Sequence, residues 1–147
     1  MAAQLYPLPV FHFRVEWGGT NLDFSEVSGL SISVKPIGYR GGLMPEYSEI
    51  KMPGVPEFTN ISLKRGVFAG DNEFFQWIST VKLNDVERRN LTISLLNGDH
   101  TPVMSWKVKN AWPTKVDGPA LSAKSTEVAI ETIELVHEGL SIENTAT

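Results

Sequence analysis

The chain contains no cysteine, no run of basic residues and no long apolar stretch. Without cysteine it can form no disulfide, thiolate nucleophile or Cys-ligated metal site, so packing and association must hold the fold together. Its 13 Lys and Arg against 17 Asp and Glu give a formal net charge of −4, which disfavours tight binding to nucleic-acid phosphates. No apolar stretch approaches the roughly 18 residues of a membrane span, and no basic segment of a signal peptide is present. We therefore expect neither secretion by a signal peptide nor membrane anchoring.

Residues for catalysis and metal binding are sparse as well. The three histidines, His12, His100 and His137, are scattered, and no two have the i, i+4 spacing of a helical metal site. No nucleophile elbow, phosphate-binding glycine loop or dinucleotide fingerprint is present. Four glutamates between 127 and 138 could pair for acid–base catalysis, but a solvated strand face is the simpler interpretation. The sequence predicts a protein that is not an enzyme and has no cofactor or metal.

The composition is that of one ordinary globular domain. The 147 residues are 41% hydrophobic and 20% charged, and no repeat, low-complexity tract or interdomain linker interrupts them. We therefore treat residues 1–147 as a single domain.

Alternation of apolar and polar residues predicts a mainly β protein. The expected strands lie at 10–17, 20–24, 30–35, 61–64, 91–95, 104–108 and 126–137. Gly18-Gly19 predicts a hairpin between the first two, and Asn97-Gly98 predicts a second hairpin. Pro36 should end the third strand or confine it to a sheet edge. In the last strand the apolar positions change phase, which indicates either a bulge near Glu131-Thr132 or a strand covered on both faces.

One helix is predicted, about three turns long from Asp71 to Val81. Asp71 suits the N-cap position and Glu73 the first turn. Apolar residues at helical spacing should pack onto the β structure, and they are Phe74, Phe75, Trp77, Ile78 and Val81.

A long loop is predicted between Tyr39 and Glu57, because glycines and prolines interrupt it throughout. Its apolar residues would form an exposed patch on an isolated subunit. The candidate interface residues in it are Leu43, Met44, Tyr47, Met52 and Val55.

Several ordered blocks resemble the tail tube family of contractile phage tails and phage-tail-like injection systems. The N-terminal and central blocks are Pro7-Leu8-Pro9-Val10-Phe11-His12-Phe13, Phe24-Ser25-Glu26-Val27-Ser28-Gly29-Leu30, Met52-Pro53-Gly54, Asn60-Ile61-Ser62-Leu63-Lys64-Arg65-Gly66-Val67-Phe68 and Gly70-Asp71-Asn72-Glu73-Phe74. The later blocks are Arg88-Arg89-Asn90-Leu91-Thr92-Ile93, Trp106, Asn110-Ala111-Trp112-Pro113, Gly118-Pro119 and Glu127-Val128-Ala129-Ile130-Glu131. The resemblance spans about residues 6 to 139, although the family varies between Tyr39 and Tyr47.

The resemblance implies a small β-barrel or sandwich with one flanking helix that forms stacked hexameric rings, the inner tube of a contractile particle. Its implied partners are other copies of the chain, a sheath protein, baseplate and tube-cap proteins, and DNA or protein cargo that passes without specific binding. Assembly in the bacterial cytoplasm is expected. The alternative is a tube-like baseplate or tail-completion adaptor.

An acidic lumen is the last expectation. Six copies at −4 each would give a formal charge of −24 per ring, and the inward-facing part would repel acidic cargo. The candidate lumen residues are Glu127 and Glu131.

Overall fold

The structure is a computed structural model that describes residues 6–19, 23–43, 45, 47, 49–82 and 85–144. Within them the chain forms strands joined by turns and a single short helix, which confirms the predicted mainly β class with one flanking helix. The elements are β1 (Phe13–Glu16), β2 (Glu26–Ser28), β3 (Ile32–Tyr39), β4 (Ile50–Phe58), β5 (Ile61–Gly66), α1 (Glu73–Ile78), β6 (Arg89–Leu96), β7 (Pro102–Asp117), β8 (Ile130–Val136) and β9 (Gly139–Asn144).

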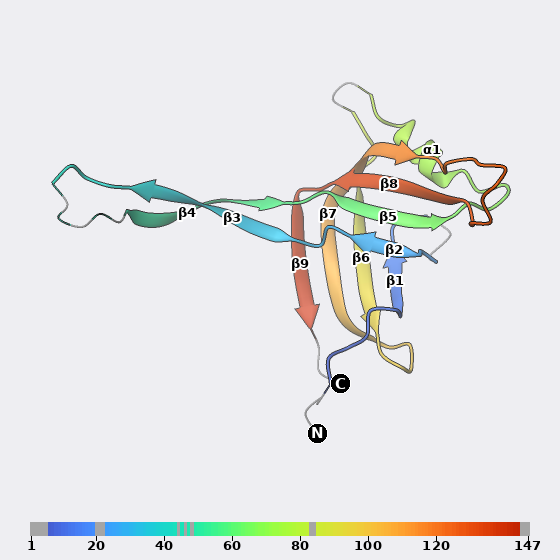
Figure 1. Cartoon of the computed structure of the whole chain (residues 1–147), viewed down its shortest axis with the longest axis horizontal. Coiled ribbons are helices and arrows are strands. Elements are labelled where there is room, and N and C mark those ends of the chain that lie inside the picture. Colours follow the sequence, from blue (N-terminus) through green and yellow to red (C-terminus); the bar gives the residue numbers. More distant parts are fainter. Residues whose placement is uncertain are drawn as a thin grey trace.

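Two antiparallel sheets share the long strand β7. The first sheet has the order β1-β6-β7-β9, and the second has the order β7-β8-β5-β2. β9 pairs with the part of β7 from Met104 to Lys109, and β8 with the part from Trp112 to Asp117. Strands of the two sheets cross steeply, so that β9, β7 and β6 run vertically in Figure 1 while β8 and β5 run horizontally. The sharing of β7 joins both sheets around one core.

The core lies between the apolar faces of the two sheets and α1. Its buried residues include Val15, Leu91 and Ile93 from the first sheet, and Leu63 and Ile133 from the second. An aromatic cluster closes it near the helix, with ring centroids 5.3 to 6.1 Å apart among Trp17, Phe24, Phe74 and Trp77. Contacts of this kind add to the stabilisation that comes from burying the rings.

The helix α1 is shorter than predicted. Phe74 and Trp77 are buried, whereas Phe75 is 61% exposed and Val81 lies beyond the helix end. Asn72, not Asp71, occupies the N-cap position, and its side chain makes no capping hydrogen bond. The Asp71 carboxylate nevertheless accepts from the backbone N–H of Glu73 at 3.3 Å. The hydroxyls of Ser79 and Thr80 donate to the backbone carbonyls of Phe75 and Trp77 in the last turn. Serine and threonine that bond to the backbone in this way are found more often at helix ends than in helix interiors.

The expected loop between Tyr39 and Glu57 is wrong from residue 50 onward, because β3 and β4 form a two-stranded hairpin that projects far from the body (Figure 1). We call this hairpin, residues 32–58, the arm. Among the described residues β3 and β4 pair only with each other, so each has an unpaired edge and the missing N–H groups of Pro36, Pro53 and Pro56 break no sheet interior. The edge position expected of Pro36 is confirmed. The buried face expected of its strand is wrong, since β3 is exposed along its length.

The hairpin predicted around Asn97-Gly98 is confirmed as β6–β7, with a turn longer than two residues. The backbone N–H of Asn97 donates to the carbonyl of Thr101 at 3.0 Å. The side-chain oxygen of Asn97 accepts from the N–H groups of Asp99 and Thr101. His100 takes the positive φ of 61°. The asparagine therefore organises a wider turn through its side chain.

Two further strand predictions concern the chain after β1 and the strand near the C-terminus. The hairpin predicted around Gly18-Gly19 stays a prediction, because residues 20–22 of its second strand lie outside the described residues; β1 itself pairs with β6. β8 begins only at Ile130, which leaves Val128 outside it. The register irregularity falls in β7 between Pro113 and Lys115, so the bulge predicted near Glu131-Thr132 is wrong. The other alternative, a strand covered on both faces, agrees with the burial of β8, in which no residue is exposed. Pairing between distant strands decides where β8 begins and where the irregularity falls, and the local sequence pattern carries no information about this pairing.

Candidate assembly surfaces

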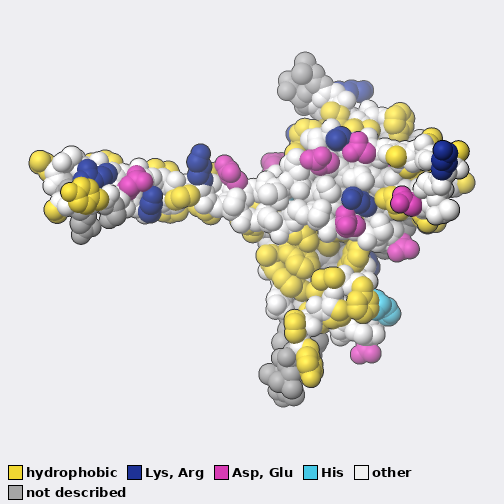
Figure 2. Space-filling view, in the orientation of Figure 1, with side chains coloured by type: hydrophobic (Ala, Val, Ile, Leu, Met, Phe, Trp, Pro, Cys, Tyr) yellow, Lys and Arg dark blue, Asp and Glu magenta, His cyan; other side chains and the backbone are white. Residues whose placement is uncertain are grey.

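The outer half of the arm presents apolar side chains on one face. Paired residues of an antiparallel hairpin point to the same side, and Ile37 pairs with Met52 while Tyr39 pairs with Ile50. All four side chains are 46% to 58% exposed. Figure 2 shows the arm as a thin rod on which hydrophobic and charged side chains alternate. A hairpin this exposed is marginally stable alone, so the face needs a partner.

The inner half presents apolar residues on the opposite face. Ile32 pairs with Phe58 and Val34 with Pro56. A register irregularity between Val34 and Pro36 separates the two halves, and a bulge bends and twists a hairpin at that point. Both sides of the arm can therefore contact other molecules.

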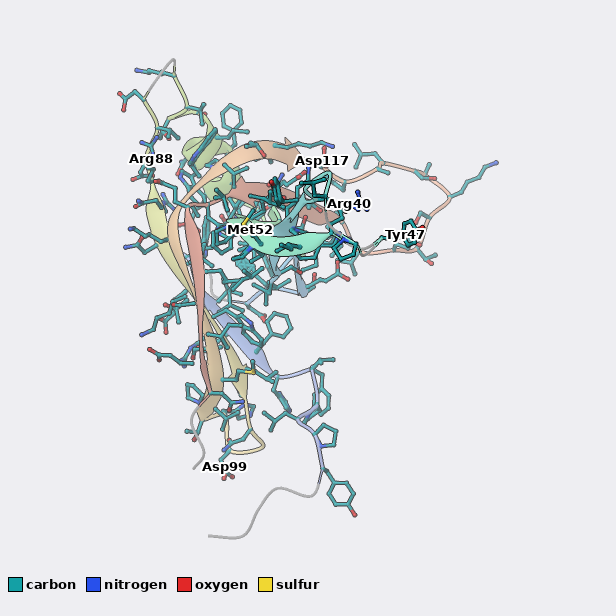
Figure 3. All side chains as sticks on the ribbon, turned by 90° about the vertical axis from the view of Figure 1, so that its left-hand side faces the viewer. Arg40, Tyr47, Met52, Arg88, Asp99 and Asp117 are labelled. Atoms are coloured by element: carbon teal, nitrogen blue, oxygen red, sulfur yellow. The ribbon has the colours of Figure 1, made fainter. Side chains whose placement is uncertain are left out.

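The predicted interface residues are distributed over the arm. Leu43 and Tyr47, near its tip, are 100% and 98% exposed, and Val55 is 80% exposed. Met52 pairs with Ile37 and presents its side chain on the same face of the arm, and Figure 3 shows it well separated from Tyr47. Met44 lies outside the described residues. Ile37, Tyr39 and Ile50 share this exposed apolar face but are absent from the predicted interface residues. The two-residue spacing of Ile37 and Tyr39, and of Ile50 and Met52, is that of a strand face.

The root of the arm is tied to the body through Gly29 and Thr59. Gly29 has φ 90°, and its carbonyl accepts from the Thr59 hydroxyl at 2.8 Å. A side chain at Gly29 would meet the backbone carbonyl of Asn60. Phe58 packs against the core, with its ring centroid 5.3 Å from that of His137. These contacts fix the direction in which the arm leaves the body.

A buried charge network lies beside the aromatic cluster. Arg65 on β5 is fully buried, and its Nε and Nη2 donate to Glu131 at 2.8 Å and to Asp71 at 2.9 Å. Its Nη1 lies 3.7 Å from a carboxylate oxygen of Glu73. The guanidinium carbon is 4.1 Å from the Phe74 ring centroid, a cation–π distance. The network joins β5, β8 and the start of α1, and a buried charge requires such partners.

Of the two predicted lumen residues, only Glu127 has an exposed carboxylate. The Glu131 side chain is 18% exposed and bound to Arg65. Glu127 is exposed in the connection between β7 and β8, and this connection lies at the end of the body opposite the arm (Figure 1). The structure thus does not bring the two together as one acidic surface.

Two of the three histidines, which are far apart in the sequence, lie close together in the structure. His12 and His100 lie with ring centroids 4.9 Å apart, while His137 is near Phe58. Across the described ranges no three His, Asp or Glu side chains form a group that could hold a metal ion. Among the same residues, no helix has the length and apolar character needed to cross a membrane.

Comparison with known proteins identifies the family of the fold. Residues 9–141 match the family model described as T4-like virus tail tube protein gp19. No curated protein sequence matches the chain.

Solved structures of contractile injection systems contain similar chains. One chain of the sheath-tube complex of an extracellular contractile injection system, PVC, in the extended state is 40% identical, with a TM-score of 0.88 over 96% of this chain and 94% of that one. A chain from the anti-feeding prophage cap is 38% identical, with a TM-score of 0.89 over 99% of this chain and 95% of that one. Hcp1 from Flavobacterium johnsoniae shares the fold alone, at 18% identity and a TM-score of 0.57 over 91% of this chain and 96% of that one.

Proposed function

The chain belongs to the T4-like virus tail tube protein gp19 family and is a structural inner tube subunit, and we propose that it assembles with copies of itself into stacked hexameric rings. The particle would be a contractile injection system, in which the tube is a conduit for DNA or protein cargo. Its further partners would be a sheath protein and baseplate and cap proteins, because its structural neighbours come from a sheath-tube complex, a tube-terminating cap and a baseplate.

The arm is the observation that supports self-assembly most directly. It exposes apolar residues on both faces, and no third strand of the described part of the chain pairs with β3 or β4. An isolated protein with such a hairpin would be prone to aggregate, whereas a ring or stack of identical copies covers the surface in every subunit. The arm is therefore suited to contact a neighbouring copy through Leu43, Tyr47, Met52 and Val55.

A tube-like baseplate adaptor is the second candidate, because a chain of the anti-feeding prophage baseplate shares the fold at a TM-score of 0.79. That chain is 22% identical, against 40% for the chain from the sheath-tube complex. The difference favours the tube subunit.

A non-enzymatic role and assembly in the bacterial cytoplasm complete the proposal. The family is one of structural tube proteins. In the charged cluster around Arg65, the carboxylates of Asp71 and Glu131 are bound to the buried guanidinium, which supports a structural role for this cluster.

Negative-stain electron microscopy of the purified protein tests the assembly. We expect rings or tubes from the wild-type chain, and folded subunits without tubes from an Ile37→Lys/Met52→Glu variant. The opposite charges at these two paired positions keep the hairpin while making its outer face polar. Leu121→Glu is the control, because Leu121 is 89% exposed but lies outside the arm. A wild-type chain that stays monomeric at high concentration would contradict the proposal.

A further inference from the structure

The turn between β6 and β7 contains the only Asn-Gly pair of the chain, Asn97-Gly98. Besides the backbone bond to Thr101, the Asn97 carbonyl accepts from the N–H of His100 at 2.9 Å. The side-chain oxygen Oδ1 of Asn97 accepts from the N–H of Asp99 at 2.9 Å and from that of Thr101 at 3.0 Å. These bonds fold the side chain back along the turn, so its amide carbon Cγ is held near the intervening Gly98.

The backbone nitrogen of Gly98 is accessible. Gly98 is exposed, and within the described ranges its N–H donates to no hydrogen-bond acceptor. Apart from its chain neighbours, no heavy atom lies within 4 Å of the place that a Cβ would take. Glycine also restricts rotation of its backbone less than any other residue. The nitrogen can therefore approach the Asn97 Cγ without displacing other groups.

The two N–H groups at Oδ1 favour attack on Cγ. When a nitrogen adds to this carbon, negative charge develops on Oδ1, and donors already directed at the oxygen stabilise that charge as in an oxyanion hole. The N–H groups of Asp99 and Thr101 stand at the distances of such donors. The amide nitrogen Nδ2 of Asn97 has no hydrogen-bond partner in the described part of the chain, so no contact holds it back as a leaving group.

Other asparagines of the described ranges lack this combination, since none of them precedes a glycine. The Nδ2 of Asn60 is held by a carboxylate at 2.9 Å. Asn90 and Asn110 lie within β6 and β7, and the residues that follow them, Leu91 and Ala111, are buried. Attack by the next backbone nitrogen would require these strands to open.

We propose that Asn97 is a site of spontaneous deamidation in the folded chain. The Gly98 nitrogen gives its proton to the solvent and forms a bond to Cγ, while the bond from Cγ to Nδ2 breaks and ammonia leaves. The product is a five-membered succinimide ring. Water then cleaves the ring at Cγ to give aspartate, or at the main-chain carbonyl carbon to give isoaspartate. Water is the only co-reactant, and the proposal does not depend on the tube function.

The two products change the turn differently. Aspartate keeps an acceptor oxygen in the place of Oδ1 and adds one negative charge, which takes the formal net charge of the chain from −4 to −5. Isoaspartate routes the main chain through the side-chain carbon and lengthens it, so the bonds from Asn97 across the turn cannot all form. The turn lies at the end of the first sheet away from α1 (Figure 1), where Figure 3 labels Asp99. Deamidation therefore changes both charge and shape at that end of the subunit.

Peptide mapping by mass spectrometry tests the site. When the folded wild-type chain is incubated in mildly alkaline buffer, Asn97 should convert before any other asparagine, and a more acidic band should appear in isoelectric focusing. Gly98→Ala is the matched control, because its methyl group enters open space. Conversion in this variant should be several-fold slower, since a side chain restricts the approach of the nitrogen. Earlier conversion at another asparagine, or an equal rate in Gly98→Ala, would overturn the inference.

The chain unfolded in guanidinium chloride separates the effect of the turn from that of the Asn-Gly sequence. Unfolding removes the donors at Oδ1 and leaves the sequence unchanged. At the same pH we expect Asn97 to convert at least as fast in the folded chain as in the unfolded one. An Asn97→Asp chain serves as the standard for the aspartate product, and isoaspartate is the second peptide of equal mass that elutes apart from it. A folded chain that keeps Asn97 intact while the unfolded chain converts would show that the turn protects the residue, and would refute the proposal.

Discussion

Arg65 and Glu131 are directly paired residues of β5 and β8, and the Nε of Arg65 donates to Oε1 of Glu131 at 2.8 Å inside the protein. The arginine follows Ile61 and Leu63 on the buried face of β5, so its charge enters the core where an apolar residue would be expected. Asp71 and the Phe74 ring complete its surroundings. Glu131 is therefore part of the scaffold, and its loss leaves a buried charge with too few partners.

Glu131→Lys should destabilise the subunit strongly, whereas Glu127→Lys should not. The first places a second cation beside Arg65 and should cost about 3–5 kcal/mol in the free energy of unfolding. The second changes an exposed side chain and should stay within about 0.5 kcal/mol. Urea unfolding of the unassembled variants measures both. Equal stabilities would show that the Arg65–Glu131 pair contributes nothing to the fold.

Phe74→Ala and Phe75→Ala compare neighbouring positions of α1 with opposite burial. Phe74 is 1% exposed and packs against Trp17 and Arg65, so its truncation should cost about 3–5 kcal/mol. Phe75 is 61% exposed, and its truncation should cost less than about 1 kcal/mol. The measurement is the urea midpoint of each variant at constant m-value. A larger loss for Phe75 would mean that α1 presents its other face to the core.

Gly29→Ala should weaken both the fold and the anchoring of the arm. The added methyl meets the Asn60 carbonyl, and the φ of 90° disfavours any side chain, so we expect a loss of about 1–3 kcal/mol. Gly98→Ala is the matched control, since nothing lies within 4 Å of the methyl position there. Thermal unfolding compares the two. Identical melting temperatures would contradict the strain assigned to Gly29.

Leu43→Ser/Tyr47→Ser should separate assembly from folding at the tip of the arm. Both side chains are almost fully exposed, so the free energy of unfolding should change by less than about 0.5 kcal/mol. Tube growth should slow, because apolar contacts with a neighbouring copy are removed. Light scattering follows growth, and circular dichroism checks the fold. Unchanged growth would exclude the tip from the subunit contact.

The sequence by itself determined the fold class, several strands and the family. Ile61 and Leu63, or Leu91 and Ile93, alternate because one side of each strand faces the core, and such a pattern is local. The absence of cysteine and of catalytic motifs likewise follows from composition alone. The apolar residues between positions 39 and 57 predict an exposed apolar surface from the sequence alone.

Only the tertiary structure decided which strands pair and which side chains meet. β1 pairs with β6, nearly eighty residues away in the chain, and no local pattern indicates this partner because packing between distant segments selects it. The arm is extended although its prolines predict a loop, because a two-stranded hairpin leaves free edges where proline is tolerated. Glu127 and Glu131 are the same residue type, but in the folded chain Glu131 binds the buried Arg65 while Glu127 is exposed to solvent. Contacts between distant residues create these differences, and no local periodicity encodes them.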